Sequence, residues 1–183
     1  MRIYRFRVLI DDPSEAFRDV EIGSEQNFQE FHNAIKQAFG FTGDEMASFY
    51  VSDEEWGKGP EIPLADLGFG EDGDTPPALM EEVYISDHMR SMRQRYIYVY
   101  DFLHLWMFMV ELIGAYDPEE GATYPRVVMA MGTPPGEHSK DLDLGPVEED
   151  EEGHTSEFDE DDYDEEDPLS GSSNIDDLGD EYL

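Results

Sequence analysis

Three side chains in this sequence have the chemistry of acid–base catalysis. Asp101 and His104 lie three residues apart, in a short segment between two strongly apolar runs. A carboxylate that orients an imidazole is a common arrangement for a general base, and His32, beside the apolar stripe of a predicted helix, is a third candidate. Each also has a structural interpretation. Asp101 can bond the N–H groups of a turn, and His32 can be a boundary residue with one bonded nitrogen.

Other catalytic and metal-binding patterns are absent from the sequence. The five histidines do not have the spacing of a metal site, and the acidic runs do not form a calcium-binding loop. The chain has no cysteine, no glycine-rich phosphate loop and no nucleophile elbow of the serine hydrolases. We therefore expect no metal and no cofactor, and we expect that the protein is not an enzyme.

The C-terminal part of the chain is strongly acidic. Of the 46 Asp and Glu residues, 20 lie in the 43 residues from Asp141 to Leu183, which contain no Lys or Arg. Such a segment repels itself and has little apolar surface to bury, so it cannot offset the entropy lost on ordering. We therefore predict a folded domain over residues 1–135 and a disordered acidic tail over residues 136–183.

The tail has three possible roles. It can keep the protein soluble, it can dock a basic partner protein, or it can cover the arginines of the first hairpin. Apolar residues among acids suit a short segment that orders on binding, so Ile175, Asp176, Asp177 and Leu178 are the candidate partner-binding residues.

The net charge excludes some classes of partner. The formal net charge is −35 and the sequence pI is near 4.1, so the chain should repel phosphate groups. We therefore predict no direct contact with nucleic acid or with an anionic membrane. No apolar run is long enough to span a bilayer and no secretory signal is visible, so we expect a soluble, cytoplasmic protein.

The N-terminal third of the sequence predicts a hairpin followed by a helix. Apolar residues alternate with arginines over residues 2–10, and a second extended segment covers residues 16–23. Asn27 and Glu30 have the spacing of a capping box, and Gly40 is a natural helix stop. The apolar stripe of the helix is Phe28, Phe31, Ile35, Ala38 and Phe39.

The rest of the body predicts mostly strands. We expect strands over residues 46–51, 96–101, 105–113 and 124–129, a short element over 62–67, a short strand over 83–85 and a brief helix over 88–93. The strands at 96–101 and 105–113 are apolar on both faces, which predicts a sheet covered on both sides. The fold class is therefore α+β, with an antiparallel or mixed sheet packed on one main helix in a β-grasp-like arrangement.

The order of several motifs resembles a known family. The sequence is similar to the plasmid Ri ORF-three-like proteins, also known as insertion-element passenger proteins of the TnpR type, over about residues 3–135. This resemblance implies an α+β fold and no established activity. The matching segments are 17–22, 27–35, 38–41, 98–102, Trp106, 124–126 and 134–135.

The sequence departs from the family pattern at its polar positions. After Asp101 and Phe102, the glycine, second aspartate and final histidine of the family segment are replaced. The acidic pair that follows the two prolines in the family is replaced by residues 136–139. Any polar site that the family pattern builds is therefore largely lost from this chain.

We interpret the protein as a non-enzymatic interaction module whose acidic tail solubilises it or docks a basic partner. Two alternatives remain. The first is an acidic DNA mimic or an accessory factor of mobile-element recombination, and the mimic requires carboxylates fixed at the spacing of duplex phosphates. A degenerate hydrolase requires Asp101, His104 and His32 to converge in one pocket.

Overall fold

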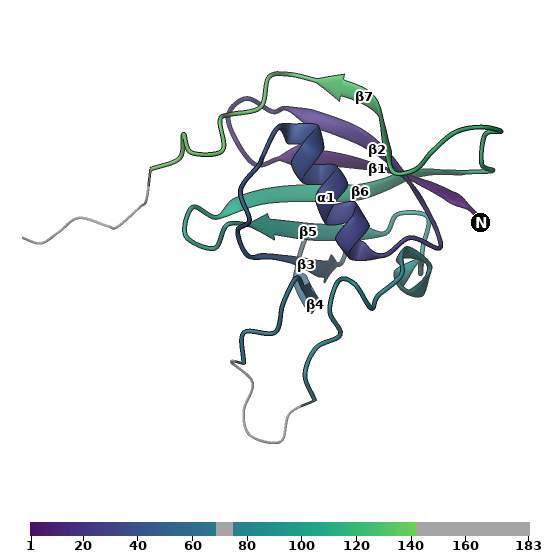
Figure 1. The fold of residues 1–183 in the computed structure, drawn as a ribbon, viewed down its shortest axis with the longest axis horizontal. Coiled ribbons are helices and arrows are strands. Elements are labelled where there is room, and N and C mark those ends of the chain that lie inside the picture. Colours follow the sequence, from purple (N-terminus) through teal and green to yellow (C-terminus); the bar gives the residue numbers. More distant parts are fainter. Residues whose placement is uncertain (69–74, 142–183) are drawn as a thin grey trace, which may run out of the picture. The chain divides into compact units, whose positions relative to one another are not determined.

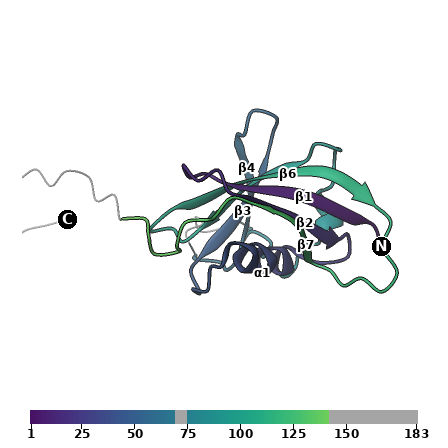
Figure 2. The same ribbon diagram turned by 90° about the horizontal axis from the view of Figure 1, so that it is seen from above.

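The computed structural model describes residues 1–68 and 75–141. Within them the chain forms one seven-stranded sheet in the order β4-β3-β5-β6-β1-β2-β7, with every neighbouring pair antiparallel. A single α-helix, α1, crosses one face of the sheet (Figures 1 and 2). The predicted α+β class, an antiparallel sheet packed on one helix, is confirmed. No helix in the described part of the chain is long and apolar enough to cross a membrane.

The first two strands form the predicted hairpin. β1 covers Ile3–Ile10 and β2 covers Phe17–Gly23, paired from Ile3 with Gly23 to Leu9 with Phe17. The alternation predicted from the sequence puts Phe6 and Val8 under the helix. β1 also pairs with β6, so the hairpin lies inside the sheet and not at its edge.

Helix α1, Phe28–Phe39, has the ends that the sequence predicted. The Asn27 side chain accepts a hydrogen bond from the Glu30 N–H at 2.9 Å, and the Glu30 carboxylate accepts one from the Asn27 N–H at 2.9 Å. Gly40 ends the helix in the left-handed region, with φ of 76°. The capping box and the glycine stop therefore fix the length of the helix locally.

Five more strands complete the sheet, and one of them begins earlier than the sequence predicted. They are β3 Ala47–Ser52, β4 Lys58–Pro63, β5 Arg95–Tyr100, β6 Trp106–Tyr116 and β7 Arg126–Met131. The element expected over 62–67 begins earlier, because Lys58 to Pro63 pair with β3 at the edge of the sheet, a position that tolerates proline.

The segment after residue 80 is also different from the prediction. The strand expected over 83–85 is a single bridge between Tyr84 and Asn27, and the helix expected over 88–93 is replaced by the short 3₁₀ helix η1, Ile85–His88. The physical reason is that this segment bonds the start of α1. The Phe28 N–H donates to the Val83 carbonyl, and the Ile85 N–H donates to the Gln26 carbonyl.

Only one face of the sheet is covered by a helix in the described part of the chain, so the expectation of two covered faces is wrong there. On the opposite face Ile97 is only 6% exposed, although no helix lies over it. In the sheet it stands between Tyr50 of β3 and Met109 of β6, two large neighbours on the same face. Cross-strand neighbours can shield a side chain without a second layer.

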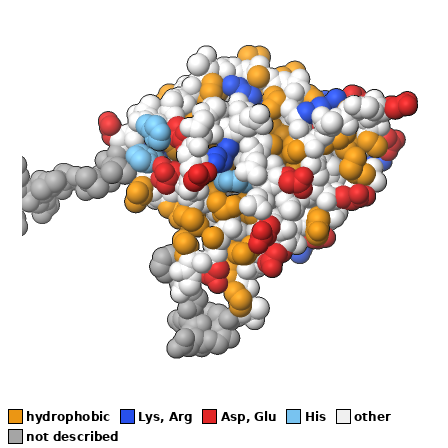
Figure 3. Space-filling view, viewed as in Figure 1, with side chains coloured by type: hydrophobic (Ala, Val, Ile, Leu, Met, Phe, Trp, Pro, Cys, Tyr) orange, Lys and Arg blue, Asp and Glu red, His pale blue; other side chains and the backbone are white. Residues whose placement is uncertain are grey.

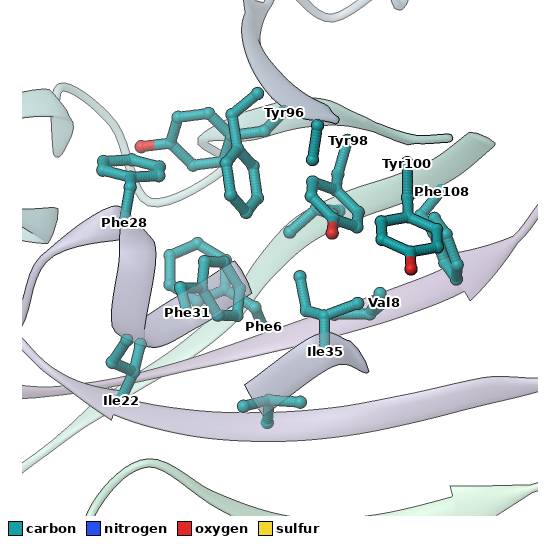
Figure 4. Close-up of a cluster of buried hydrophobic side chains, with 14 of the residues drawn as sticks. Phe6, Val8, Ile22, Phe28, Phe31, Ile35, Tyr96, Tyr98, Tyr100 and Phe108 are labelled. Atoms are coloured by element: carbon teal, nitrogen blue, oxygen red, sulfur yellow. The ribbon is translucent and has the colours of Figure 1, made fainter. Parts of the chain in front are cut away.

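The core lies between α1 and the central strands. Phe31 packs against Phe6, with ring centroids 5.1 Å apart (Figure 4). Phe31 also stacks on Phe49 at 5.5 Å, and Phe39 meets Phe108 at 4.9 Å. The apolar stripe predicted for the helix packs on the central strands in one buried cluster. Its members include Phe28, Phe31, Ile35, Phe39, Tyr98, Tyr100 and Phe108.

Candidate functional site

Asp101 and His104 meet in the turn between β5 and β6. Asp101 has a φ of 58°, and its Oδ1 atom accepts hydrogen bonds from the N–H groups of Leu103 at 3.0 Å and His104 at 3.2 Å. Its Oδ2 atom lies 2.6 Å from His104 Nδ1. Both carboxylate oxygens of Asp101 are thus bonded inside the turn. This agrees with the interpretation that Asp101 stabilises the turn.

The electrostatics of the pair agree with that role. Burial works to raise the pKa of the Asp101 carboxyl, but the hydrogen bonds from His104 and from the turn N–H groups outweigh it, so the pKa lies below its ordinary value. The carboxylate is therefore ionised at neutral pH and can accept all of these bonds. An ionised, fully bonded Asp101 holds the tight connection between the two central strands.

His32 lies on the buried side of α1. Its Nδ1 atom is 2.7 Å from the hydroxyl of Tyr98, and its side chain is 3% exposed. Burial, with a smaller contribution from the positive charge of Lys36, lowers the pKa of His32 to about 4. The imidazole is therefore neutral at physiological pH and serves Tyr98 as a buried polar partner.

The described contacts do not unite the three catalytic candidates. His32 is bonded to Tyr98, and Asp101 is bonded to His104. Among residues 1–68 and 75–141, no hydrogen bond or ion pair links one pair to the other. None of His32, Asp101 and His104 lines the cavities of about 760 Å³ and 410 Å³ in the described part of the chain.

A buried carboxylate that the sequence did not single out, Glu137, is the centre of a polar cluster near this turn. Glu137 is 8% exposed and accepts hydrogen bonds from Thr42 N–H at 2.7 Å, Gly43 N–H at 2.9 Å and the Tyr100 hydroxyl at 2.6 Å. Its own carbonyl accepts a bond from Trp106 Nε1 at 2.9 Å. Residues 136–141, which the sequence placed in the tail, include this contact, so the packed body extends beyond residue 135.

Glu137 is held as an anion. Burial works to raise the pKa of this carboxyl, but the bonds from Tyr100, Thr42 and Gly43 lower it below the ordinary value. The pKa of Tyr100 is raised, first by burial and then by its bond to Glu137, so its hydroxyl remains a donor. Glu137 thus ties the end of the domain to Thr42 and Gly43 in the loop after α1 and to Tyr100 at the end of β5. We call these four residues the Glu137 clasp.

We expect Gly43→Ala to loosen this clasp. A Cβ atom at position 43 would lie 2.6 Å from Glu137 Oε1 and 2.9 Å from the Tyr100 hydroxyl, so bonded atoms would have to move. The expected loss of unfolding free energy is about 1–3 kcal/mol, measured by urea denaturation. Gly136→Ala is the matched control, because its Cβ would meet its nearest neighbour, Ser139, at 3.9 Å. Equal losses in the two variants would contradict the clasp.

Arg5 and Arg7 of the first hairpin are already paired with carboxylates. On the face opposite α1, Arg5 bonds Glu21 at 2.6 Å and Arg7 bonds Asp19 at 2.8 Å, and Arg126 of β7 bonds the second oxygen of Glu21 at 2.8 Å. A cavity of about 410 Å³ borders Arg5, Glu21 and Arg126. An anion, or the acidic tail, would have to break these pairs in order to use the guanidinium groups.

Strand β7 has an unusual surface for the edge of a sheet. It pairs only with β2 among the described strands, and the run Val127–Met131 contains no charged residue. Val127, Met129 and Met131 are 44%, 49% and 57% exposed. Figure 3 shows hydrophobic side chains along the upper rim of the molecule, where Figure 1 places β7. The sequence predicted this edge strand, but not its exposure on both faces.

The remaining site prediction concerns the tail. Ile175, Asp176, Asp177 and Leu178 lie outside the described residues, as do the residues from 142 onward for which we predict disorder. Their role as partner-binding residues therefore stays a prediction.

Comparisons with known proteins identify the family of the chain. A solved structure of a protein of unknown function from Methanosarcina mazei Go1 has the same fold, with a TM-score of 0.63 and 20% sequence identity over 76% of this chain and 75% of that chain. The search of the curated proteins found no match. The family model of the plasmid pRiA4b ORF-3-like proteins matches residues 2–167. Since that match covers most of the sequence, as the motifs between Phe17 and Pro135 suggested, the chain belongs to the plasmid pRiA4b ORF-3-like family.

Proposed function

We propose that this protein is a non-catalytic interaction module that binds an extended segment of a basic partner protein as an additional strand beside β7. The observation that carries the proposal is the exposed, uncharged edge at Val127–Met131. We also propose that the scaffold which presents this edge is β-grasp-like.

The edge has the chemistry needed for strand addition. The outer side of an edge strand presents N–H and C=O groups without sheet partners, and a peptide that pairs with them gains main-chain hydrogen bonds. Natural edges usually carry charges or other devices that prevent such pairing. β7 has Pro125 before it and a register shift between Asp19 and Val20 of β2, but no charge after Arg126. An apolar strand can therefore pack on it without burying an unpaired charge.

The charge of the chain indicates a basic partner. Residues 1–140 contain 26 acidic and 11 basic residues, a net charge of −15, and the 20 acids of the tail begin ten residues after Met131. An acidic field attracts Lys and Arg and repels a second copy of the same chain. The tail adds attraction that depends on salt, whereas β7 supplies the apolar and main-chain contacts.

The roles of the buried polar groups support a binding function. Asp101 shapes a turn, His32 serves Tyr98, and Glu137 clasps the end of the domain. Each of these titratable groups has a partner that explains its presence in the fold. None of them needs a substrate to satisfy its hydrogen bonds.

The test is a titration of the full-length protein with a fluorescent peptide of alternating valine and threonine, flanked by lysines. We expect Met129→Lys to weaken binding at least tenfold, because it places a charge on the edge. Met92→Lys is the matched control: Met92 is 68% exposed and the charge change is identical, so binding should stay within about threefold.

The peptide itself provides two further controls. Raising the ionic strength to 0.15 M, where the screening length is about 8 Å, should weaken binding of the lysine-flanked peptide. A peptide with a central proline lacks a strand N–H group and should bind much more weakly. Equal affinity of the Met129→Lys and Met92→Lys proteins would refute binding at β7.

A further inference from the structure

A second surface, separate from β7, has the form of a small-molecule site. An open cavity of about 760 Å³ borders Ser48 and Tyr50 of β3, whose side chains lie on the face opposite to Phe49 and therefore away from α1. Residues that follow β4 and Phe102 of the β5–β6 turn form its other walls. This volume is within the usual range of ligand pockets. The apolar walls include Met46, Pro63, Pro77 and Phe102. The cavity thus has room and apolar surface for a compact organic molecule.

One solvent-exposed carboxylate, that of Glu61, borders the cavity and is positioned by two hydrogen bonds. Glu61 on β4 stands opposite Tyr50 on β3 in the sheet register. Its Oε1 atom accepts hydrogen bonds from Ser48 Oγ at 2.6 Å and from the Tyr50 hydroxyl at 3.2 Å. The hydrogen bonds of the described residues leave Oε2 free. One oxygen is therefore held by the sheet, and the other is available to a ligand.

The charged residues of the described lining have one sign. Glu61 and Asp66 are acidic, and the lining residues within 1–68 and 75–141 include no Lys, Arg or His. The ring of Tyr50 already attracts a cation, since Lys58 Nζ lies 4.8 Å from its centroid. An anionic ligand would be repelled by these carboxylates, whereas a cation can donate a charge-assisted hydrogen bond to the free oxygen of Glu61.

We propose that this cavity binds a small organic ammonium ion, whose nitrogen donates to Glu61 Oε2 and whose apolar body lies against Tyr50, Phe102 and the prolines. A charge-assisted hydrogen bond to a positioned carboxylate supplies the polar recognition. Burial of the body supplies the rest of the binding free energy. This site is independent of strand addition at β7.

The test is a two-dimensional NMR titration of the full-length protein with three ligands of similar shape. They are 2-phenylethylamine, 2-phenylethanol and 3-phenylpropanoate. We expect saturable shifts of the Ser48 and Tyr50 amide signals with the amine, at a dissociation constant on the order of 1 mM, a reasonable affinity for so small a ligand. The alcohol should bind at least tenfold more weakly, and the carboxylate should produce no saturable shift.

A variant that removes the charge of Glu61 but keeps its size tests where the amine binds. Glu61→Gln should weaken amine binding at least tenfold, whereas Glu55→Gln, in the exposed turn before β4, should leave it unchanged. The inference is overturned if the alcohol binds as well as the amine, or if Glu61→Gln retains full affinity. The lysine-flanked peptide used for β7 should not move these signals. If the peptide shifts them and the amine does not, the site is not one for a small ammonium ion.

Discussion

Phe31→Ala should lower the free energy of unfolding by about 3–5 kcal/mol. Phe31 is fully buried, stacks on Phe49 of β3 at 5.5 Å and packs against Phe6 of β1 at 5.1 Å. Truncation to alanine removes the side chain that joins the helix to two separate strands. The cavity left behind cannot close fully, because its walls belong to different elements of a rigid sheet. Urea denaturation at neutral pH measures the loss.

An exposed apolar residue provides the control for this variant. Leu103, in the β5–β6 turn, is 74% exposed, so Leu103→Ala should change the free energy of unfolding by less than about 0.5 kcal/mol. A loss below about 1 kcal/mol for Phe31→Ala would show that α1 does not depend on this contact. The sheet would then need another source of cohesion on its covered face.

The second large effect is a loss of stability in mild acid through His32. The pKa of His32 is lowered by burial from the ordinary 6.5 to about 4. As the pH falls through 6.5, the unfolded chain takes up a proton that the folded protein does not. Stability from this group is complete above about pH 6.5 and falls until about pH 4. The expected loss is roughly 2 kcal/mol between pH 7 and pH 5, and roughly 3 kcal/mol in total.

The His32→Asn variant isolates this contribution. Asparagine keeps a polar atom near the Nδ1 position for Tyr98 but does not titrate. His88, whose pKa is also lowered by burial, adds to the acid sensitivity of both proteins and cancels in the comparison. We expect the variant to be less stable at pH 7, with a flatter dependence of stability on pH between 7 and 5. Parallel pH curves for the two proteins would show that folding does not change the pKa of His32, which contradicts its burial as a neutral imidazole.

The elements that the sequence predicted well depend on neighbours close in the chain. Asn27 and Glu30 form the capping box within one helical turn, and Gly40 ends the same helix. Asp101 and His104 meet because only three residues separate them. Alternation in β1 similarly fixed which side chains face the core. In each case the deciding contact is local, so a single sequence contains the information.

The features that the sequence missed depend on contacts between distant residues. Glu137 bonds Thr42, 95 residues away, and Tyr100, 37 residues away, and it lies just before a long acidic run that hides it. The family resemblance offered a signal, since acidic residues follow the two prolines in that pattern and Glu137 follows Pro135. The open face of the sheet was missed because an apolar residue such as Ile97 on that face suggests a second covering layer. In the structure, its cross-strand neighbours Tyr50 and Met109 shield it instead.

The proposed binding mode follows from the same distinction. The sequence identified β7 as an edge strand, but only the sheet order shows that its exposed residues have no neighbour beyond β2 among the described strands. Five successive apolar residues at such an edge are a hazard for self-association unless something covers them or charge keeps copies apart. The net charge of −35 makes copies of the free protein repel one another. The same charge attracts a strand from a basic partner.

Amide hydrogen exchange of the full-length protein, with and without saturating lysine-flanked peptide, tests the central claim most directly. If the peptide pairs with β7, the amides within Arg126–Met131 that face away from β2 gain a hydrogen-bond acceptor, so their exchange should slow markedly. The opposite edge, β4 at Lys58–Pro63, provides the internal control and should exchange at an unchanged rate. Slower exchange at β4 alone, or unchanged exchange at β7 while the peptide is bound, would contradict strand addition at this edge.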